Sequence, residues 1–261
     1  MTRADALERY RELPVPDTAE EHWRFTDLRG FDPDSYGHDR GQTPDVAVPS
    51  MLALDVAAEA VVTETGIEIT RAPAEIRFEP LDESHERLGA LVGWQGDKFA
   101  AHNAAAWQHG LLVHVPGGLE LERPLFVRVV NAIESGSLFW RLLVIAEEGS
   151  RFSLVEEYAS ASAGLPGYFN GVAELFVEQN AKLEYVSLQN LSRETWHFAS
   201  HHARVERDAE LDWVSGGFGS KKGKVRIQND LAGPGATSRV TGAYFADGAC
   251  SPDPRSGDPR Q

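Results

Sequence analysis

Hydrophobic and polar positions follow different patterns on the two sides of residue 110. In the first part, apolar residues recur at a three-residue spacing over residues 4–13 and predict a helix there. A capping signal ahead of residues 20–24 predicts a second, short helix. Residues 29–50 are rich in Asp, Gly, Pro and Ser and show no periodicity, so they predict a loop.

The next segment mixes both kinds of element. Alternating apolar and polar residues over residues 56–78 predict strands. The apolar spacing over residues 84–108 predicts a helix, which Gly93 and Gly96 divide into two. We therefore assign residues 1–109 to an N-terminal helical and mixed region.

Beyond residue 110 the chain is dominated by β-branched and aromatic residues, separated by Gly, Asn and Asp. This pattern predicts a β core over residues 110–248. Residues 249–261 contain three prolines and no apolar alternation. Because proline cannot donate a hydrogen bond to a strand ladder, this tail is predicted to be irregular.

The β region contains an internal repeat. Its unit is a small residue, a spacer, an apolar residue, a spacer, an apolar or aromatic residue, and a valine. Three copies begin at Ser150, Ala181 and Ala209 and a weaker fourth at Ala236, at steps of 31, 28 and 27 residues. A near-constant period indicates a stacked architecture in which one unit cannot bury its apolar face alone.

Two architectures fit this repeat. In a parallel β-helix each unit is a coil, and its strands pair with the equivalent strands of the next coil. In an antiparallel sandwich or jelly roll the same corners are hairpin turns. The constant unit length favours the β-helix.

Charge, cysteine content and apolar runs argue against several classes of function and cellular location. The 261 residues include 40 acidic and 25 basic side chains, for a formal charge of −15, which argues against a sequence-independent grip on nucleic acid or anionic lipid. The single cysteine, Cys250, can neither form an internal disulfide nor hold zinc or an iron–sulfur cluster alone. The N-terminus lacks the apolar stretch of a secretory signal, and the strongest apolar run, residues 138–146, is too short to span a bilayer. We expect a cytoplasmic protein.

A histidine cluster provides the candidate metal ligands. His197 and His201 are four residues apart, which is a metal-ligand spacing on a helix. The flanking pattern is that of a strand, where this separation is about 13 Å and too long for one ion. His202 is expected on the opposite face. We predict no metal site in this chain, and keep His197 and His201 only as candidate ligands of a site that a partner would complete.

Paired carboxylates suggest an enzymatic alternative. Glu156 with Glu157, and Asp82 with Glu83, resemble the acid and base pairs of glycosidases, and some parallel β-helices act on carbohydrates. No third catalytic partner can be placed beside either pair. The chain is therefore predicted to be a scaffold or binding protein without catalytic residues, with a carbohydrate-active β-helix enzyme using Glu156 or Glu157 as the alternative.

Other polar residues receive structural interpretations. Asp97, His102 and His109 lie on a helical pattern and are interpreted as capping and surface residues. The run 216–224, GGFGSKKGK, lacks a following helix, so it predicts a glycine-rich corner with solvent-facing lysines rather than a phosphate cradle.

Five strings along the chain carry a family resemblance, and the first two are residues 20–28, EEHWRFTDL, and residues 99–119. Residues 20–28 resemble the E-x-W-R-[YF]-T-x-L signature near the N-terminus of SufD members of the SufB/SufD family, which belongs to the SUF iron–sulfur cluster assembly machinery. Residues 99–119 resemble the entry into the β core of that family. Three later strings fit that core in order and spacing, namely residues 154–158, 170–174 and 183–189. The resemblance covers about residues 1–248 and implies a right-handed parallel β-helix behind an N-terminal α-helical region.

The resemblance also implies a function. It indicates a non-catalytic scaffold subunit that works through contacts with a SufB-like paralogue and a SufC-like ATPase. The isolated chain is expected to bind no cofactor, because the iron–sulfur cluster is assembled in the complex. A small-molecule-binding β-barrel of the cupin kind, which requires antiparallel strands, is a further hypothesis.

The C-terminus departs from the family pattern. Family members continue past residue 248 with further coils and a helical segment that docks SufC, so the resemblance implies a chain truncated at its C-terminus, with SufC docking lost. We expect the last coil to expose Val240, Tyr244 and Phe245. Such an end would associate with another chain.

Overall fold

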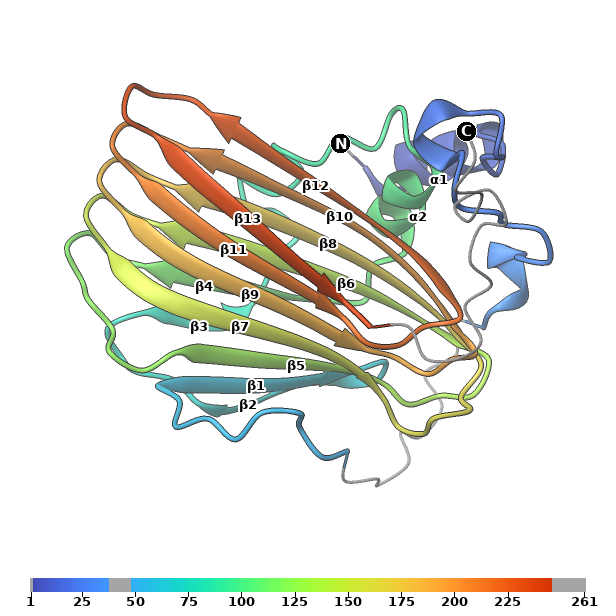
Figure 1. Cartoon of the computed structure of the whole chain (residues 1–261), viewed down its shortest axis with the longest axis horizontal. Helices are drawn as coiled ribbons and strands as arrows, with labels where there is room; N and C mark the ends of the chain where they lie inside the picture. The colour runs from blue at the N-terminus through green and yellow to red at the C-terminus, as the bar shows by residue number, and fades with distance from the viewer. Residues whose placement is uncertain (1, 38–47, 246–261) are drawn as a thin grey trace, which may run out of the picture.

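Two facing β-sheets form a parallel β-solenoid of about five turns (Figure 1). The computed structural model describes residues 2–37 and 48–245. Sheet A has the order β12-β10-β8-β6-β4-β3, and sheet B has the order β13-β11-β9-β7-β5-β1-β2. The predicted parallel β-helix, with strands predominating and a helix near the N-terminus, is confirmed.

The strands have the following bounds. Sheet A contains β3 (Arg77–Pro80), β4 (His109–Val115), β6 (Gly136–Ala146), β8 (Gly167–Val177), β10 (Thr195–Val205) and β12 (Lys222–Leu231). Sheet B contains β1 (Ala58–Thr63), β2 (Gly66–Arg71), β5 (Leu125–Asn131), β7 (Arg151–Ser160), β9 (Lys182–Asn190), β11 (Glu210–Gly217) and β13 (Thr237–Tyr244).

The sequence repeat corresponds to the stacking of coils. Arg151 pairs with Lys182, Lys182 with Glu210, and Glu210 with Thr237, all in parallel strands. The four copies therefore lie one above the next in register. Parallel pairing between equivalent strands excludes the sandwich and the cupin-like barrel for this region, since both need antiparallel pairs.

A left-handed corner precedes each copy of the repeat. Gly149, Asn180, Asp208 and Gly235 have φ angles of 71°, 57°, 54° and 74°. Glycine adopts this conformation without strain, and Asn and Asp tolerate it better than other residues. These residue types are therefore what allow the chain to turn from sheet A into sheet B at the same place in successive coils.

The solenoid interior is the main hydrophobic core. In each strand alternate side chains point inward, and those of sheet A meet those of sheet B. The interior residues are fully or almost fully buried, and include Leu111, Val113, Leu125, Val127, Leu138, Leu142, Val144, Leu154, Leu175, Leu183 and Leu211.

The N-terminal region covers the outer face of sheet A. It contains α1 (Arg3–Glu12), the short 3₁₀ helices η1 (Glu21–Trp23) and η2 (Pro33–Ser35), and α2 (Lys98–Ala106). The two α-helices contact each other, and α2 contacts β6, β8 and β10 (Figure 1). A second hydrophobic core fills this interface, with Trp23, Leu28, Phe31, Phe99, Trp107, Phe139, Tyr168, Trp196 and Phe198 among its buried members.

Residues 84–96 are not helical, contrary to the prediction. Their backbone follows an irregular path across sheet A because the buried Glu174 carboxylate accepts hydrogen bonds from the backbone N–H groups of Gly89, Leu91 and Val92 at 2.7, 2.7 and 3.0 Å. These bonds replace those of a helix. The predicted short helix at residues 20–24 is present only as the single 3₁₀ turn η1.

The ends of the solenoid differ. Strands β1, β2 and β3, which precede residue 110, join the two sheets below β5 and β4, so strands come from both sides of the predicted boundary. At the other end, the side chains of Val240, Tyr244 and Phe245 are 48%, 73% and 74% exposed. The predicted irregular tail and Cys250 lie outside the described residues.

No helix in residues 2–37 and 48–245 is long and apolar enough to cross a membrane.

The corner geometry yields a stability prediction. A Cβ at Gly149 would meet no atom closer than 3.9 Å, so Gly149→Ala adds conformational strain without a steric clash. We expect this variant to lose ~1–2 kcal/mol of unfolding free energy in chemical denaturation. Asn180→Gly, at an equivalent corner, should change stability by less than ~1 kcal/mol. Equal losses in the two variants would show that the left-handed conformation is not the constraint.

Candidate functional site

A buried polar cluster interrupts the apolar core of the solenoid. Its centre is Glu156 on β7, which is fully buried. Trp140 donates its indole N–H to Glu156 Oε1 at 2.5 Å, and the Tyr185 hydroxyl donates to Glu156 Oε2. Burial raises the pKa of the Glu156 carboxyl, although hydrogen bonds from Tyr185, Tyr158 and Trp140 act in the opposite direction.

Two histidines of β10, in the opposite sheet, lie beside the tyrosines of this cluster. His197 and His201 both point into the interior, each 2% exposed. The Tyr158 hydroxyl lies 3.4 Å from His201 Nε2, and the His201 ring stacks on Trp213 with centroids 5.7 Å apart. Burial lowers the pKa of His197 to about 3 and that of His201 to about 4, so both imidazoles are neutral at physiological pH.

The solenoid thus joins candidates that are separate in the sequence. Glu156 and the histidine pair come from different sheets, and no local pattern in the sequence indicates that they share one interior. The repeat does contain one signal of a polar interior: Glu156, Ser187 and Ser215 occupy the same position of the repeat and stack in register. Polar residues at one repeat position form a row along the solenoid axis.

No group of three His, Cys, Asp or Glu side chains in residues 2–37 and 48–245 is arranged to hold a metal ion. Within the same residues, His197 Nε2, His201 Nδ1 and Trp213 Nε1 are buried without a hydrogen-bond partner. His197 and His201 therefore remain only candidates for a site completed from outside the chain.

Glu157 lies on the opposite side of the strand from Glu156. Its carboxylate accepts hydrogen bonds from the Ser50 hydroxyl at 2.5 Å and the Met51 backbone N–H at 2.9 Å, and it lies 3.4 Å from Arg128 Nε. Because successive strand residues point to opposite faces, the two carboxylates do not form an acid and base pair around one substrate. Glu157 instead anchors the segment before β1 to sheet B.

The second carboxylate pair is also structural. Asp82 accepts a hydrogen bond from the Ser84 backbone N–H at 2.7 Å, and Glu83 forms an ion pair with Arg3 at 2.6 Å. These contacts hold the segment before α2 in place.

Asp97, His102 and His202 have distinct places. Asp97 caps α2, as predicted, by accepting the N–H groups of Phe99 and Ala100. His102 is 3% exposed and stacks on Tyr10 at 4.0 Å, so its interpretation as a surface residue was wrong. His202 projects from the outer face, as predicted, with Nδ1 2.8 Å from the Leu91 carbonyl oxygen and Nε2 2.9 Å from an Asp230 carboxylate oxygen.

His109 and the glycine-rich run complete the set. His109 is the first residue of β4, so its placement on a helical pattern was wrong, and its Nε2 lies 3.1 Å from the Glu64 carbonyl oxygen. Gly216 and Gly217 end β11 and Lys222 begins β12, so the run is a corner between strands, as predicted.

Comparison with known proteins identifies the family. The family model described as "SUF system FeS cluster assembly, SufBD core domain" matches residues 128–255. Residues 128–255 therefore belong to the SufB/SufD family. The match begins in β5 and takes in the four copies of the repeat, so the strands that stack in register are also those that identify the family.

Curated relatives agree with this assignment. An iron–sulfur cluster assembly SufBD family protein of Staphylococcus epidermidis is 28% identical over 161 residues, which are 62% of this chain and 35% of the relative. A SufBD family protein of Staphylococcus aureus strain USA300 is 29% identical over 159 residues, 61% of this chain and 34% of the relative. The chain thus aligns with about a third of the length of these SufB/SufD relatives.

The buried histidines predict a pH dependence of stability. Between their folded pKa values of about 3 and 4 and the ordinary value of 6.5, the unfolded chain binds protons that the folded chain does not. Stability therefore falls as the pH drops through this window. Between about pH 5 and pH 6, the free energy of unfolding of His201→Gln should depend less steeply on pH than that of the wild type. The difference in slope should correspond to the uptake of about one proton per chain on unfolding.

Chemical denaturation at a series of pH values measures this slope. The raised pKa of Glu156 affects the slope with the opposite sign, because the stability that a protonated buried carboxyl provides is lost as the pH rises. This effect is the same in the wild type and in His201→Gln, so it does not alter the difference between their slopes. The control Ser215→Ala changes a buried residue that does not titrate and should leave the slope unchanged. An unchanged slope in His201→Gln would contradict the neutral, buried state of this histidine.

Proposed function

We propose that this SufB/SufD family member is a SufD-type, non-catalytic scaffold subunit of the cytoplasmic SUF machinery. It acts through contacts with a SufB-like paralogue and a SufC-like ATPase. The observation that carries this proposal is the match of residues 128–255 to the SufBD core domain. The SufD-like signature at residues 20–28 supports the more specific assignment.

The strand edge that β12 and β13 form in the described residues supports a scaffold role. Strands β12 and β13 each have one neighbour in their sheets within the described residues, so each presents an edge of backbone N–H and C=O groups. An unpaired strand edge is a template for pairing with another chain. The exposed apolar side chains of Val240 and Tyr244 lie on β13, and we place the SufB-like contact there.

The iron–sulfur cluster is the cargo of this complex. The interior polar cluster supplies two neutral histidines and one buried carboxyl, and the described residues contain no complete ligand set. We propose that a partner supplies the ligands on which the cluster is built. The isolated chain should then purify without stoichiometric iron or acid-labile sulfide.

Co-purification tests the proposal. The tagged chain, expressed with SufB and SufC from the same organism, should retain SufB. Val240→Asp combined with Tyr244→Asp should reduce the retained SufB at least tenfold, because it places charge on the apolar edge. The control Leu54→Asp changes another partly exposed apolar residue, away from β13, and should have no effect.

Two outcomes would contradict the proposal. If the wild-type chain does not retain SufB, the proposed scaffold function is wrong. If the double variant and Leu54→Asp retain equal amounts of SufB, the surface around Val240 and Tyr244 is not the SufB contact.

A further inference from the structure

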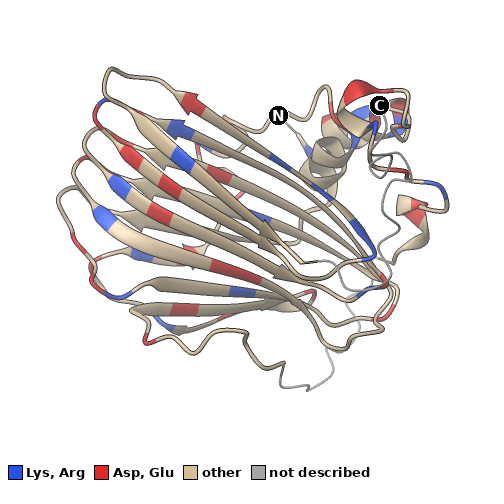
Figure 2. Ribbon diagram, in the orientation of Figure 1, with Lys and Arg blue, Asp and Glu red and all other residues tan. Residues whose placement is uncertain are grey.

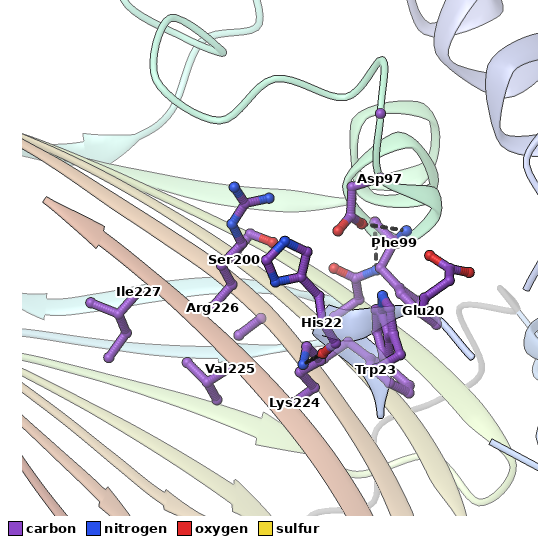
Figure 3. Close-up of a pocket in the computed structure, with 14 residues that line it drawn as sticks. Glu20, His22, Trp23, Asp97, Phe99, Ser200, Lys224, Val225, Arg226 and Ile227 are labelled. Atoms are coloured by element: carbon purple, nitrogen blue, oxygen red, sulfur yellow. Dashed lines mark hydrogen bonds between the residues drawn. The ribbon is translucent and has the colours of Figure 1, made fainter. Parts of the chain in front are cut away.

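A hollow on the outer face of sheet A has features of a ligand site. It encloses about 370 Å³ between the segment around Trp23, the start of α2, and strands β10 and β12 (Figure 3). Sites for small molecules are typically concave and of about 300–1,000 Å³. The scaffold function proposed above makes no use of this hollow.

Two cations line the strand side of the hollow. Lys224 pairs in register with Phe198, and Arg226 pairs with Ser200. Because alternate residues of a strand share a face, all four project toward the same side of the sheet. Figure 2 shows basic residues along β12, and Figure 3 shows Lys224 and Arg226 beside the hollow.

Neither cation has an anionic partner in the described part of the chain. Lys224 donates to the His22 backbone carbonyl and lies 4.9 Å from the centroid of the Trp23 ring. The Arg226 guanidinium donates only one long hydrogen bond, to Gln228 Oε1 at 3.3 Å. Basic residues on and near the neighbouring strands do form ion pairs, as Arg204 does with Glu206 and Lys221 with Glu194. Two unpaired cations at one hollow therefore point to an anion from outside the chain.

The remaining walls limit the kind of anion. Phe99 and Phe198 stack at 3.9 Å and, with Trp23, form an aromatic floor. Glu20 and Asp97 lie on the side opposite the strands (Figure 3). Their charge disfavours a ligand with several negative groups, because a second anion would face a carboxylate.

We propose that this hollow binds a small molecule with a single oxyanion group, phosphate or carboxylate, through Lys224, Arg226 and the Ser200 hydroxyl. Arginine binds both groups with two parallel hydrogen bonds, and lysine adds a compact charge. The Ser200 hydroxyl has no hydrogen-bond partner among the described residues and can donate to the same group. The rest of the ligand would lie over the aromatic floor.

This assignment gives the N-terminal signature a role. Residues 20–28, singled out by their sequence, supply His22 and Trp23 to the hollow, while Lys224 and Arg226 belong to the last coil. A bound ligand would therefore connect the N-terminal segment to the end of the solenoid. Ligand binding should slow amide hydrogen exchange in residues 20–28.

Titration with inorganic phosphate and, separately, with acetate tests the site. At constant ionic strength, the amide resonances of residues 20–23 and 224–227 should shift saturably with at least one of the two, and the tighter of the two identifies the preferred oxyanion. Arg226→Gln should weaken this binding at least tenfold, whereas Arg226→Lys should restore part of it. Arg204→Gln removes the same charge from the outer face of the neighbouring strand and is the matched control.

The outcomes separate a site from general charge effects. Arg226 is exposed, so its substitution should leave the fold intact, which the unchanged resonances of the solenoid interior would verify. Saturable binding that is lost in Arg226→Gln and retained in Arg204→Gln supports the proposal. Shifts that never saturate, or equal losses in the two variants, would overturn it.

Discussion

Register between coils is the constraint on which the rest of this molecule depends. Each strand of the solenoid pairs in parallel with the equivalent strand of the next coil, so a residue's place in the repeat determines whether it points inward or outward. Small residues at the start of the copies, Ser150, Ala181 and Ala209, are completely buried at the corners. The left-handed residue before each of them keeps the corners aligned. A slip by one residue would exchange the two faces of a strand.

The same register builds both polar features of the molecule. It stacks Glu156, Ser187 and Ser215 inside the solenoid, opposite the histidines of β10. On the outer face it sets Arg226 beside Ser200. The interior cluster and the outer hollow thus both follow from the alternation of inward and outward side chains along neighbouring strands.

Buried carboxylates attach the irregular segments to this regular core. Glu64 accepts hydrogen bonds from the N–H groups of Ala132 and Ile133, Glu157 holds the segment before β1, and Glu174 holds residues 89–92. Burial of a carboxylate is costly unless hydrogen bonds compensate it. Burial raises the pKa of Glu64 even with those bonds, so its environment disfavours the charged form. These three residues fix segments whose own sequences specify no regular structure.

Prediction from the sequence succeeded where local pattern and structure coincide. Three features depend only on residues that are close together in the sequence: the repeat beginning at Ser150, the corners of that repeat, and the Asp97 cap. Residues 84–96 were predicted as helix because their apolar spacing fits one, but the competing hydrogen-bond acceptor, Glu174, lies some 80 residues away in the sequence. His102 was misplaced because its burial depends on Tyr10 and sheet A. The polar interior and the outer hollow both arise from residues on different elements, which no local pattern reveals.

Disulfide trapping between coils tests the register most directly. In a Cys250→Ser background, Glu184→Cys with Asp212→Cys joins register partners of β9 and β11, whose Cα atoms lie within disulfide range. Glu184→Cys with Glu210→Cys shifts the second site by two residues, to about 8 Å, which is beyond that range. Mild oxidation followed by peptide mass spectrometry should find the first crosslink and not the second. Crosslinking of the shifted pair in preference to the register pair would contradict the stacking of coils described here.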